Sequence, residues 1–318
     1  LVSSDLIEVE KVLDEHVQSP IPLAYEISKY LLGSGGKRLR PSVLLLASGA
    51  CGNVEGKKRI YSAASLELIH TASLLHDDVV DEATLRRGKT SSNMIWGNKP
   101  TVLVGDFMLA RALNLMQSCG ELELIDSVTE AASRLAEGQV LEVMNSQRMI
   151  DFTEEVCFGI IENKTASLIE SCGRVGAILA NVDADLKNKF SFYGFKLGVA
   201  FQLTDDALDY SGNESEFGKE IGHDLLEGKM TLPLYYSLQN ADKNDRKRVK
   251  DFIENMDMGN GDMSFVFEIV KEYGGVQKTL EKAKDSVIEA KKAIESVPDN
   301  EYHKSLDLLA EYVVERNI

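Results

Sequence analysis

Apolar residues recur at spacings of three and four along almost the whole chain of 318 residues. This spacing places them on one face of an α-helix. No strand-like alternation flanked by hairpin turns is present, and no linker, repeat or low-complexity tract divides the chain. The pattern therefore predicts an all-α protein with a single domain over residues 1–318. The expected helices cover residues 5–18, 21–33, 41–51, 57–77, 101–119, 121–148, 152–171, 173–181, 184–211, 231–240, 242–256, 262–273, 275–296 and 299–316.

Two clusters of the form Asp-Asp-x-x-Asp, at residues 77–81 and 205–209, each close an apolar stretch that reads as helix. The first and last aspartates of each cluster are four residues apart, so they share one helix face and repel one another. A single cluster could be a solvated helix end, but two copies are hard to explain as surface decoration. A cation that neutralises both clusters is expected. Magnesium suits them, because it is usually held by one or two carboxylates together with substrate phosphates.

Basic residues gather in two glycine-bearing breaks between the predicted helices. Residues 35–41 read Gly-Gly-Lys-Arg-Leu-Arg-Pro, and residues 86–89 read Arg-Arg-Gly-Lys, just past the first aspartate cluster. The first run lies at a helix N-terminus, where backbone N–H groups favour an anion. Each run taken alone is more often solvated surface. Together with the aspartates, they predict a site for a diphosphate substrate.

The net charge of −16 argues against nucleic acid as a partner. The four cysteines form no Cys-x-x-Cys pair, so neither a zinc site nor a disulfide framework is indicated. No apolar run reaches the length of a membrane span, and the N-terminus shows no signal-peptide pattern. We therefore expect a cytoplasmic protein with no membrane span.

These motifs, in this order and spacing, resemble the trans-isoprenyl diphosphate synthases over nearly the whole chain. The match is closest to the long-chain, octaprenyl-type polyprenyl branch, of which His-Asp-Asp-Val-Val-Asp at residues 76–81 and Val-Gly-Asp-Phe at residues 104–107 are typical. The resemblance implies an all-α helical bundle around a central cavity, the isoprenoid synthase fold. It also implies a homodimer, with the apolar segment at residues 101–116 as a candidate contact surface.

The family implies a role for each matching residue. Three magnesium ions would be held with the diphosphate by Asp77, Asp81 and Asp205, supported by Asp78, Asp206 and Asp209. Isopentenyl diphosphate would be bound by Lys37, Arg40, His70 and Arg87, although a buried structural histidine is an alternative for His70. The allylic diphosphate would be bound by Arg86, Lys164, Lys219 and Lys229. The polar groups of Lys164, Thr165 and Gln202 would lie near the allylic cation, and the loop at residues 211–224 would close over the site.

The expected reaction is a head-to-tail condensation. The allylic C–O bond ionises, and isopentenyl diphosphate attacks the resulting cation to give a chain one isoprene unit longer. Ala72 and Ser73 lie about one turn before the first aspartate cluster, and both are small. A growing chain could pass them, so we expect a product from heptaprenyl to decaprenyl, with octaprenyl the best single expectation. It would be made from farnesyl or geranylgeranyl diphosphate as a quinone side-chain precursor.

Several alternatives remain open at this point. A shorter-chain farnesyl or geranylgeranyl diphosphate synthase would carry the same motifs. A non-catalytic subunit of a heteromeric synthase is disfavoured by the intact aspartate clusters. A class I terpene cyclase usually has Asn, Ser or Thr, and Glu in its second metal motif and needs no isopentenyl site. A metal phosphohydrolase built on His76 and Asp77 lacks further histidine ligands and ranks last.

Overall fold

The computed structural model describes residues 1–146, 153–211, 222–254 and 263–315, and most of them are helical. The all-α prediction is confirmed. Contacts between residues group the chain into two compact units. Unit 1 comprises Leu1–Ala132, Leu168–Gly194 and Ala293–Asp307, and unit 2 comprises Ser133–Ser167, Phe195–Lys292 and Leu308–Ile318. The expectation of a single domain stays a prediction, and each unit is described below by itself.

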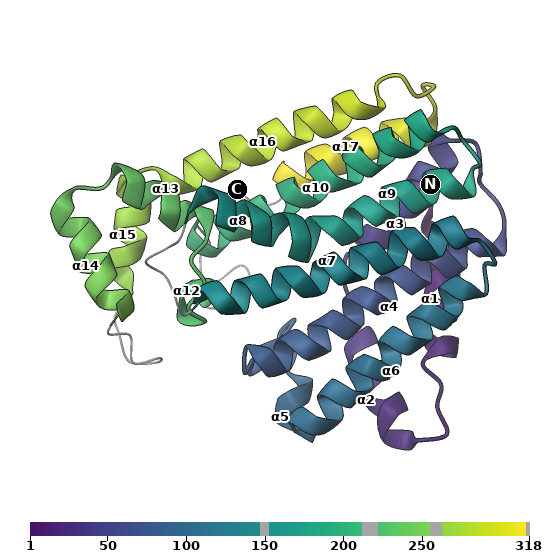
Figure 1. The fold of residues 1–318 in the computed structure, drawn as a ribbon, viewed down its shortest axis with the longest axis horizontal. Helices are drawn as coiled ribbons and strands as arrows, with labels where there is room; N and C mark the ends of the chain where they lie inside the picture. Colours follow the sequence, from purple (N-terminus) through teal and green to yellow (C-terminus); the bar gives the residue numbers. More distant parts are fainter. Residues whose placement is uncertain (147–152, 212–221, 255–262, 316–318) are drawn as a thin grey trace. The chain divides into compact units, whose positions relative to one another are not determined.

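Helix α4 is the centre of unit 1, because its residues 62–69 are all buried. It packs against α1, α3, α5 and α6, and α4 and α6 lie side by side over much of their length (Figure 1). A short antiparallel hairpin follows α4. The elements of this part of the chain are α1 (Ser3–His16), α2 (Pro22–Leu32), α3 (Leu39–Ala50), α4 (Lys57–Val80), β1 (Leu85–Arg86), β2 (Lys89–Thr90), α5 (Ser92–Trp96) and α6 (Asn98–Gln117).

Unit 2 contains a second hydrophobic cluster, which includes Tyr210, Leu225, Leu234, Val249 and Val266. Its own elements are α8 (Glu154–Ile160), the π-helix η2 (Ile161–Ala166), α12 (His223–Leu226), α13 (Leu232–Asn240), α14 (Lys243–Glu254) and α15 (Ser264–Glu272). Five further helices have residues in both units: α7 (Leu122–Ser146), α9 (Ser167–Leu179), α10 (Ala184–Ser211), α16 (Gly275–Ile294) and α17 (Glu301–Glu315).

The predicted helix break near residue 172 is wrong. Helices α8 and α9 are joined without interruption by η2, and Gly173 lies inside α9. A Cβ atom at Gly173 would come within 2.1 Å of the Phe190 carbonyl oxygen of α10. Glycine therefore allows two helix backbones to approach closely here, and it does not end a helix.

The sequence pattern also missed the hairpin at β1 and β2, because each strand has only two residues. Arg87 and Gly88 form its turn, with φ values of 52° and 74°. Two successive positive φ values are typical of the type I′ turn that matches the twist of a hairpin. This turn holds Arg86 and Arg87, two of the predicted diphosphate ligands, in a fixed local conformation.

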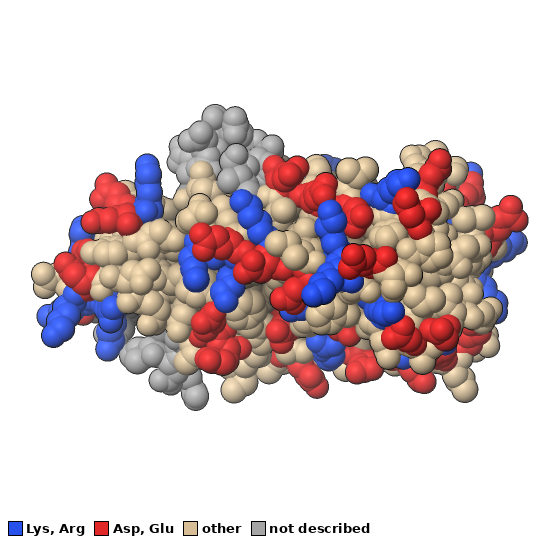
Figure 2. Space-filling model, turned by 90° about the horizontal axis from the view of Figure 1, so that it is seen from above, with Lys and Arg blue, Asp and Glu red and all other residues tan. Residues whose placement is uncertain are grey.

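Acidic and basic side chains are interspersed over the face of the molecule shown in Figure 2. The net negative charge is therefore distributed over solvated helix surfaces on that face and is not gathered into one patch. Among the helices that the structure describes, none combines the length and the low polarity that a bilayer crossing requires.

Candidate active site

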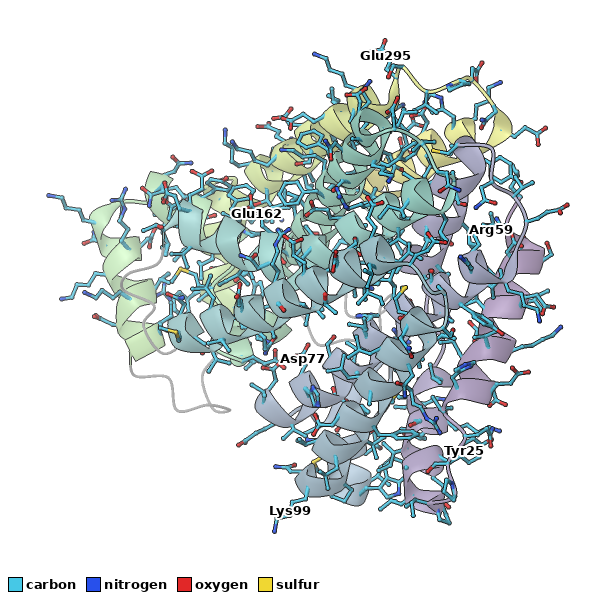
Figure 3. All side chains as sticks on the ribbon, turned by 45° about the vertical axis from the view of Figure 1, so that its right-hand side comes forward. Tyr25, Arg59, Asp77, Lys99, Glu162 and Glu295 are labelled. Carbon is cyan, nitrogen blue, oxygen red and sulfur yellow. The ribbon has the colours of Figure 1, made fainter. Side chains whose placement is uncertain are left out.

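The first aspartate cluster lies at the C-terminal end of α4. Figure 3 shows Asp77 near this end and Arg59 near the opposite end of the same helix. Asp78 is completely buried, and Asp81 caps the helix with its N–H donating to the Asp77 carbonyl oxygen at 2.8 Å. The C-terminus of a helix carries a partial negative charge, so three carboxylates there repel both one another and the helix end. A cation relieves this repulsion, and the donor set therefore fits a hard divalent metal.

Arg86 lies directly on this cluster. Its Nε and Nη2 atoms are each 2.6 Å from Asp78 Oδ1. A charge-assisted contact of this length to a fully buried carboxylate fixes the guanidinium beside the aspartates. Asp78 thus positions Arg86 in the structure, whereas its predicted support of a metal stays a prediction.

His76 fixes the end of α4 against α6. Its Nε2 atom lies 3.3 Å from Asp106 Oδ1 and 3.2 Å from the Val102 carbonyl oxygen. A Cβ atom at Gly105 would come within 2.3 Å of the same ring nitrogen. Gly105 and Asp106 therefore fix the position of His76, the residue that precedes Asp77. The sequence did not reveal this structural role.

The two basic runs, which are separate in the sequence, meet in the structure. Arg87 Nη1 donates to the Gly35 carbonyl oxygen, 52 residues away in the chain. A Cβ atom at Gly36, where φ is 151°, would lie 3.0 Å from the same Arg87 nitrogen. Glycine at this position therefore leaves the space that the guanidinium fills. Lys37 and Arg40 follow this loop at the start of α3.

His70 lies on α4, two turns before Asp77, and is only partly exposed. Burial lowers the pKa of His70 well below its usual value, and the positive charges of Arg40, Arg87, Arg86 and Arg38 lower it further. The imidazole is therefore neutral at pH 7. A neutral ring can donate or accept a hydrogen bond near these four arginines without adding to the repulsion among them.

The second aspartate cluster lies near the C-terminal end of α10, within unit 2. Gln202 Nε2 donates to Asp206 Oδ1 at 2.8 Å, and Thr165 Oγ1 donates to Gln202 Oε1 at 2.8 Å. The structure thus brings together Thr165, Gln202 and Asp206 in one hydrogen-bonded chain that joins η2 to α10. A π-helical segment such as η2 is often found at a functional site.

Repulsion among buried carboxylates is strong in this cluster. Burial raises the pKa of Asp206 well above its usual value, and the charge of Asp224 raises it further. Burial, followed by the charge of Asp209, raises the pKa of Asp224 to about 7. The Asp224 N–H lies 3.2 Å from Asp209 Oδ2, so the segment after residue 222 is attached to the cluster. These carboxylates also fit a cation.

In the described parts of the chain, no group of three or more His, Cys, Asp or Glu side chains is arranged so that it could hold a metal ion. Magnesium is usually held by one or two carboxylates together with substrate phosphates and water. The carboxylates would then serve as partial ligands and not as a complete binding site.

Two of the predicted allylic diphosphate ligands share one acidic partner. Lys164 Nζ donates to Glu142 Oε2, and Lys229 Nζ lies 3.7 Å from the same oxygen. Lys229 also donates to Glu227 at 2.8 Å. The structure thus brings Lys164 and Lys229 together. Lys219 and most of the predicted lid at residues 211–224 lie outside the described residues.

The glycines of neighbouring helices hold the η2 segment in place. A Cβ atom at Gly138 of α7 would lie 2.3 Å from the Lys164 backbone nitrogen, and one at Gly198 of α10 would lie 2.6 Å from Ala166 Cα. The backbone that carries Lys164 and Thr165 is therefore enclosed on two sides.

Sequence reasoning missed the acidic partners Glu67 and Glu142. Glu67 is 2% exposed and belongs to the buried stretch of α4. The sequence feature that could have revealed Glu67 is its position as the single charged residue in the otherwise uncharged run at residues 60–75. Glu142 gave no such signal, because its stretch of α7 contains other polar residues.

Ala72 is buried, and Ser73 Oγ donates to the His70 carbonyl oxygen at 2.8 Å, but their contact with a growing chain stays a prediction.

Comparison with known proteins identifies the family. Residues 21–270 match the family described as Polyprenyl synthetase. Octaprenyl diphosphate synthase of Escherichia coli is 38% identical over 319 residues, which cover 100% of this chain and 97% of the relative. The crystal structure of a decaprenyl diphosphate synthase from Rhodobacter capsulatus is 37% identical with a TM-score of 0.93, covering 99% of this chain and 97% of the other. A polyprenyl synthase from Caulobacter crescentus, complexed with calcium and isoprenyl diphosphate, is 35% identical with a TM-score of 0.95, covering 100% and 96%.

The chain belongs to the polyprenyl synthetase family. The predicted family, fold class and enzyme class are thereby confirmed: it is a trans-polyprenyl diphosphate synthase, a prenyltransferase.

Proposed function

We propose that this enzyme makes octaprenyl diphosphate by magnesium-dependent condensation of isopentenyl diphosphate with farnesyl or geranylgeranyl diphosphate. One observation carries the proposal: in each unit, a cluster of repelling aspartates lies on a helix end, and the same unit holds lysines or arginines suited to phosphate. Such an arrangement fits a ligand that contains both a divalent cation and a diphosphate.

Asp77, Asp81 and Asp205 would hold the magnesium ions, with Asp78, Asp206 and Asp209 in support. Bound magnesium would supply electrostatic stabilisation of the departing diphosphate. Lys164 and Lys229, assisted by Arg86 and Lys219, bind the allylic diphosphate. Lys37, Arg40, His70 and Arg87 bind isopentenyl diphosphate and orient its double bond.

The allylic C–O bond breaks, and the diphosphate leaves with the electron pair. Thr165 and Gln202 present fixed dipoles to the allylic cation, because each is already held by the hydrogen bonds that run to Asp206. The double bond of isopentenyl diphosphate then forms the new C–C bond, and a proton is lost to the released diphosphate.

Ala72 and Ser73 support a long product, because neither side chain would block a chain that extends along α4 from the aspartates. The octaprenyl and decaprenyl synthases among the relatives support the same length. The exposed apolar residues of α6, which include Val102, Leu103 and Leu113, support a homodimer through residues 101–116. We also propose a cytoplasmic location, consistent with the charged surface.

Product analysis tests this proposal. Purified enzyme is incubated with labelled isopentenyl diphosphate and farnesyl diphosphate, with and without magnesium, and the products are separated by length. Asp77→Ala and Asp205→Ala should each lower turnover about a hundredfold or more, the cost of losing one preorganised charge-stabilising group. Asp126→Ala, which removes an exposed carboxylate of α7, is the matched control and should keep full turnover.

Turnover that survives chelation or either cluster substitution in folded protein would refute the metal role. A wild-type chain with no turnover would indicate the non-catalytic subunit instead. Products that end at farnesyl or geranylgeranyl length would refute the octaprenyl assignment while leaving the chemistry intact.

A further inference from the structure

Arg38 lies inside the basic loop at residues 35–41, yet its side chain points to protein carboxylates. Its Nη1 atom donates to Glu67 Oε1 at 2.9 Å, and its Nη2 atom donates to Glu10 Oε2 at 3.0 Å. Nη2 also lies 3.3 Å from the Leu32 carbonyl oxygen. Arg38 thus ties the start of α3 to α1 and α4 and to the end of α2.

The backbone of Arg38 is held in an unusual conformation. Its φ is 47°, in the left-handed region that costs a residue with a Cβ about 1 kcal/mol or more. Such a conformation persists where the surroundings determine it. The contacts of Arg38 with Glu10 and Glu67 fix this backbone conformation. Arg38 lies one residue after Lys37 and two residues before Arg40.

Glu67 is the buried counter-charge of the arginines around His70. It is 2% exposed, and its charge raises the pKa of Arg87, which burial lowers. Burial also lowers the pKa of Arg38, but the hydrogen bond to Glu10 and the charge of Glu67 outweigh burial and raise it overall. Glu67 therefore interacts with two arginines of the pocket, and Arg38 is the one it contacts directly.

We propose that Arg38 and Glu67 form a positioning pair for isopentenyl diphosphate: Arg38 fixes the loop that carries Lys37 and Arg40, and it holds the Glu67 carboxylate away from the phosphate-binding arginines. This inference rests on the proposed function of those residues. Arg38 itself does not bind substrate in this proposal, because its guanidinium is directed at Glu10 and Glu67.

The sign of the effect follows from charge. Without Arg38, the Glu67 carboxylate loses its direct partner, and its charge still acts on Arg87, one of the arginines that should bind the diphosphate. The carboxylate then competes with the substrate for this arginine, and the loop also loses its anchor. Both changes weaken isopentenyl diphosphate binding. Removing the charge of Glu67 from the same variant ends the competition, so part of the affinity should return.

The experiment compares Arg38→Gln, Glu67→Gln and the double variant by steady-state kinetics in the full enzyme with magnesium. Arg38→Gln should raise the KM for isopentenyl diphosphate about tenfold to a hundredfold, the range of one charge-assisted contact. The KM for the allylic diphosphate should stay within about twofold by the same scale. Adding Glu67→Gln to Arg38→Gln should recover at least about threefold of the lost affinity, a coupling that simple loss of stability would not give.

Arg59→Gln is the matched control. Arg59 is also a buried arginine joining α4 to α1, through Asp5 at 2.9 Å, but it lies at the other end of α4. It should lower thermal stability without moving either KM. If Arg38→Gln does not fold, Arg38→Lys takes its place, because a single ammonium cannot reach both carboxylates as the guanidinium fork does.

Arg40→Ala distinguishes a failure of the positioning pair from a failure of the proposed isopentenyl diphosphate site. If Arg40→Ala raises the KM for isopentenyl diphosphate but neither Arg38 variant does, the positioning pair is refuted and the proposed site stands. If Arg40→Ala also leaves this KM unchanged, the proposed site itself fails. Equal rises in both KM values, or additive losses in the double variant, would assign Arg38 and Glu67 to stability alone.

Discussion

Gly138 offers the sharpest test of the allylic diphosphate site, because it controls the position of Lys164 without touching any proposed substrate. An ideal Cβ atom at Gly138 would lie 2.3 Å from the Lys164 nitrogen, 2.8 Å from Lys164 Cα and 2.9 Å from the Asn163 carbonyl carbon. All three are backbone atoms, so no side chain can rotate away. Gly138→Ala must therefore separate α7 and η2 by about 1 Å to restore an ordinary contact of roughly 3.5 Å.

Two opposing effects set the magnitude. Overpacking of this kind costs about 1–3 kcal/mol, and replacing glycine by alanine inside a helix returns about 1 kcal/mol. The net loss is about 0–2 kcal/mol, which lowers the melting temperature by at most a few degrees. Function should suffer more than stability. A shift of about 1 Å in Lys164 changes its contact with Glu142 and the neighbouring Thr165 to Gln202 hydrogen bond, and such misplacement can lower kcat/KM by about a hundredfold.

The assay measures kcat/KM for each substrate and the melting temperature of Gly138→Ala beside Gly159→Ala. Gly159 is the matched control, because its Cβ would lie 3.5 Å from Leu141 Cδ2, an ordinary contact. The control should be at least as stable as the wild type and fully active. Gly138→Ala should lose efficiency toward the allylic diphosphate while binding isopentenyl diphosphate normally. Equal behaviour of the two variants would refute the idea that Gly138 sets the position of Lys164.

Three further predictions concern α4. Burial and four arginines keep the His70 imidazole neutral at pH 7. His70→Gln should therefore bind isopentenyl diphosphate with an affinity within a few-fold of wild type, whereas His70→Ala should lose about tenfold in affinity. Similar losses in both variants would point to a structural histidine. The pKa of His70 is lower in the folded chain than in the unfolded chain, so below about pH 6.5 the unfolded chain binds one more proton at this residue. The free energy of unfolding should therefore fall as the pH decreases through this range. His70→Gln should remove this part of the pH dependence. Ala72→Phe or Ser73→Phe should shorten the product to farnesyl or geranylgeranyl length with isopentenyl diphosphate still consumed, and an unchanged product distribution would contradict the pocket argument.

The sequence predicted what depends on local spacing. The helices that carry Asp77 and Asp205 follow from apolar periodicity, and each cluster follows from its own five residues. Thr165 and Gln202 were expected to lie near the allylic cation, and Asp206 was expected to support a metal. The hydrogen bonds that join these three residues could not be foreseen, because they depend on how η2 packs against α10.

The pairing of distant groups could not be predicted from spacing. Arg87 meets Gly35 because the hairpin contacts α2, where Tyr30 Oη donates to the Thr90 carbonyl oxygen. Lys164 meets Glu142 because Gly138 lets two backbones approach. The missed continuity of α8, η2 and α9 has the same origin. Glycine can end a helix or allow close helix packing, and only the partner backbone decides between these roles.

The two units place like charges together in opposite senses: carboxylates in unit 2 and arginines in unit 1. In unit 2, Asp206 and Asp224 are buried among other carboxylates, which raises the pKa of both and disfavours their charged forms. In unit 1, four arginines act on His70, and Glu67 is the buried carboxylate that directly contacts one of them. In the proposed function, a magnesium-bound allylic diphosphate would relieve the repulsion among the carboxylates, and isopentenyl diphosphate would relieve the repulsion among the arginines. Each substrate would then reduce a different electrostatic cost, so the two sets of residues would discriminate between substrates that share the same head group.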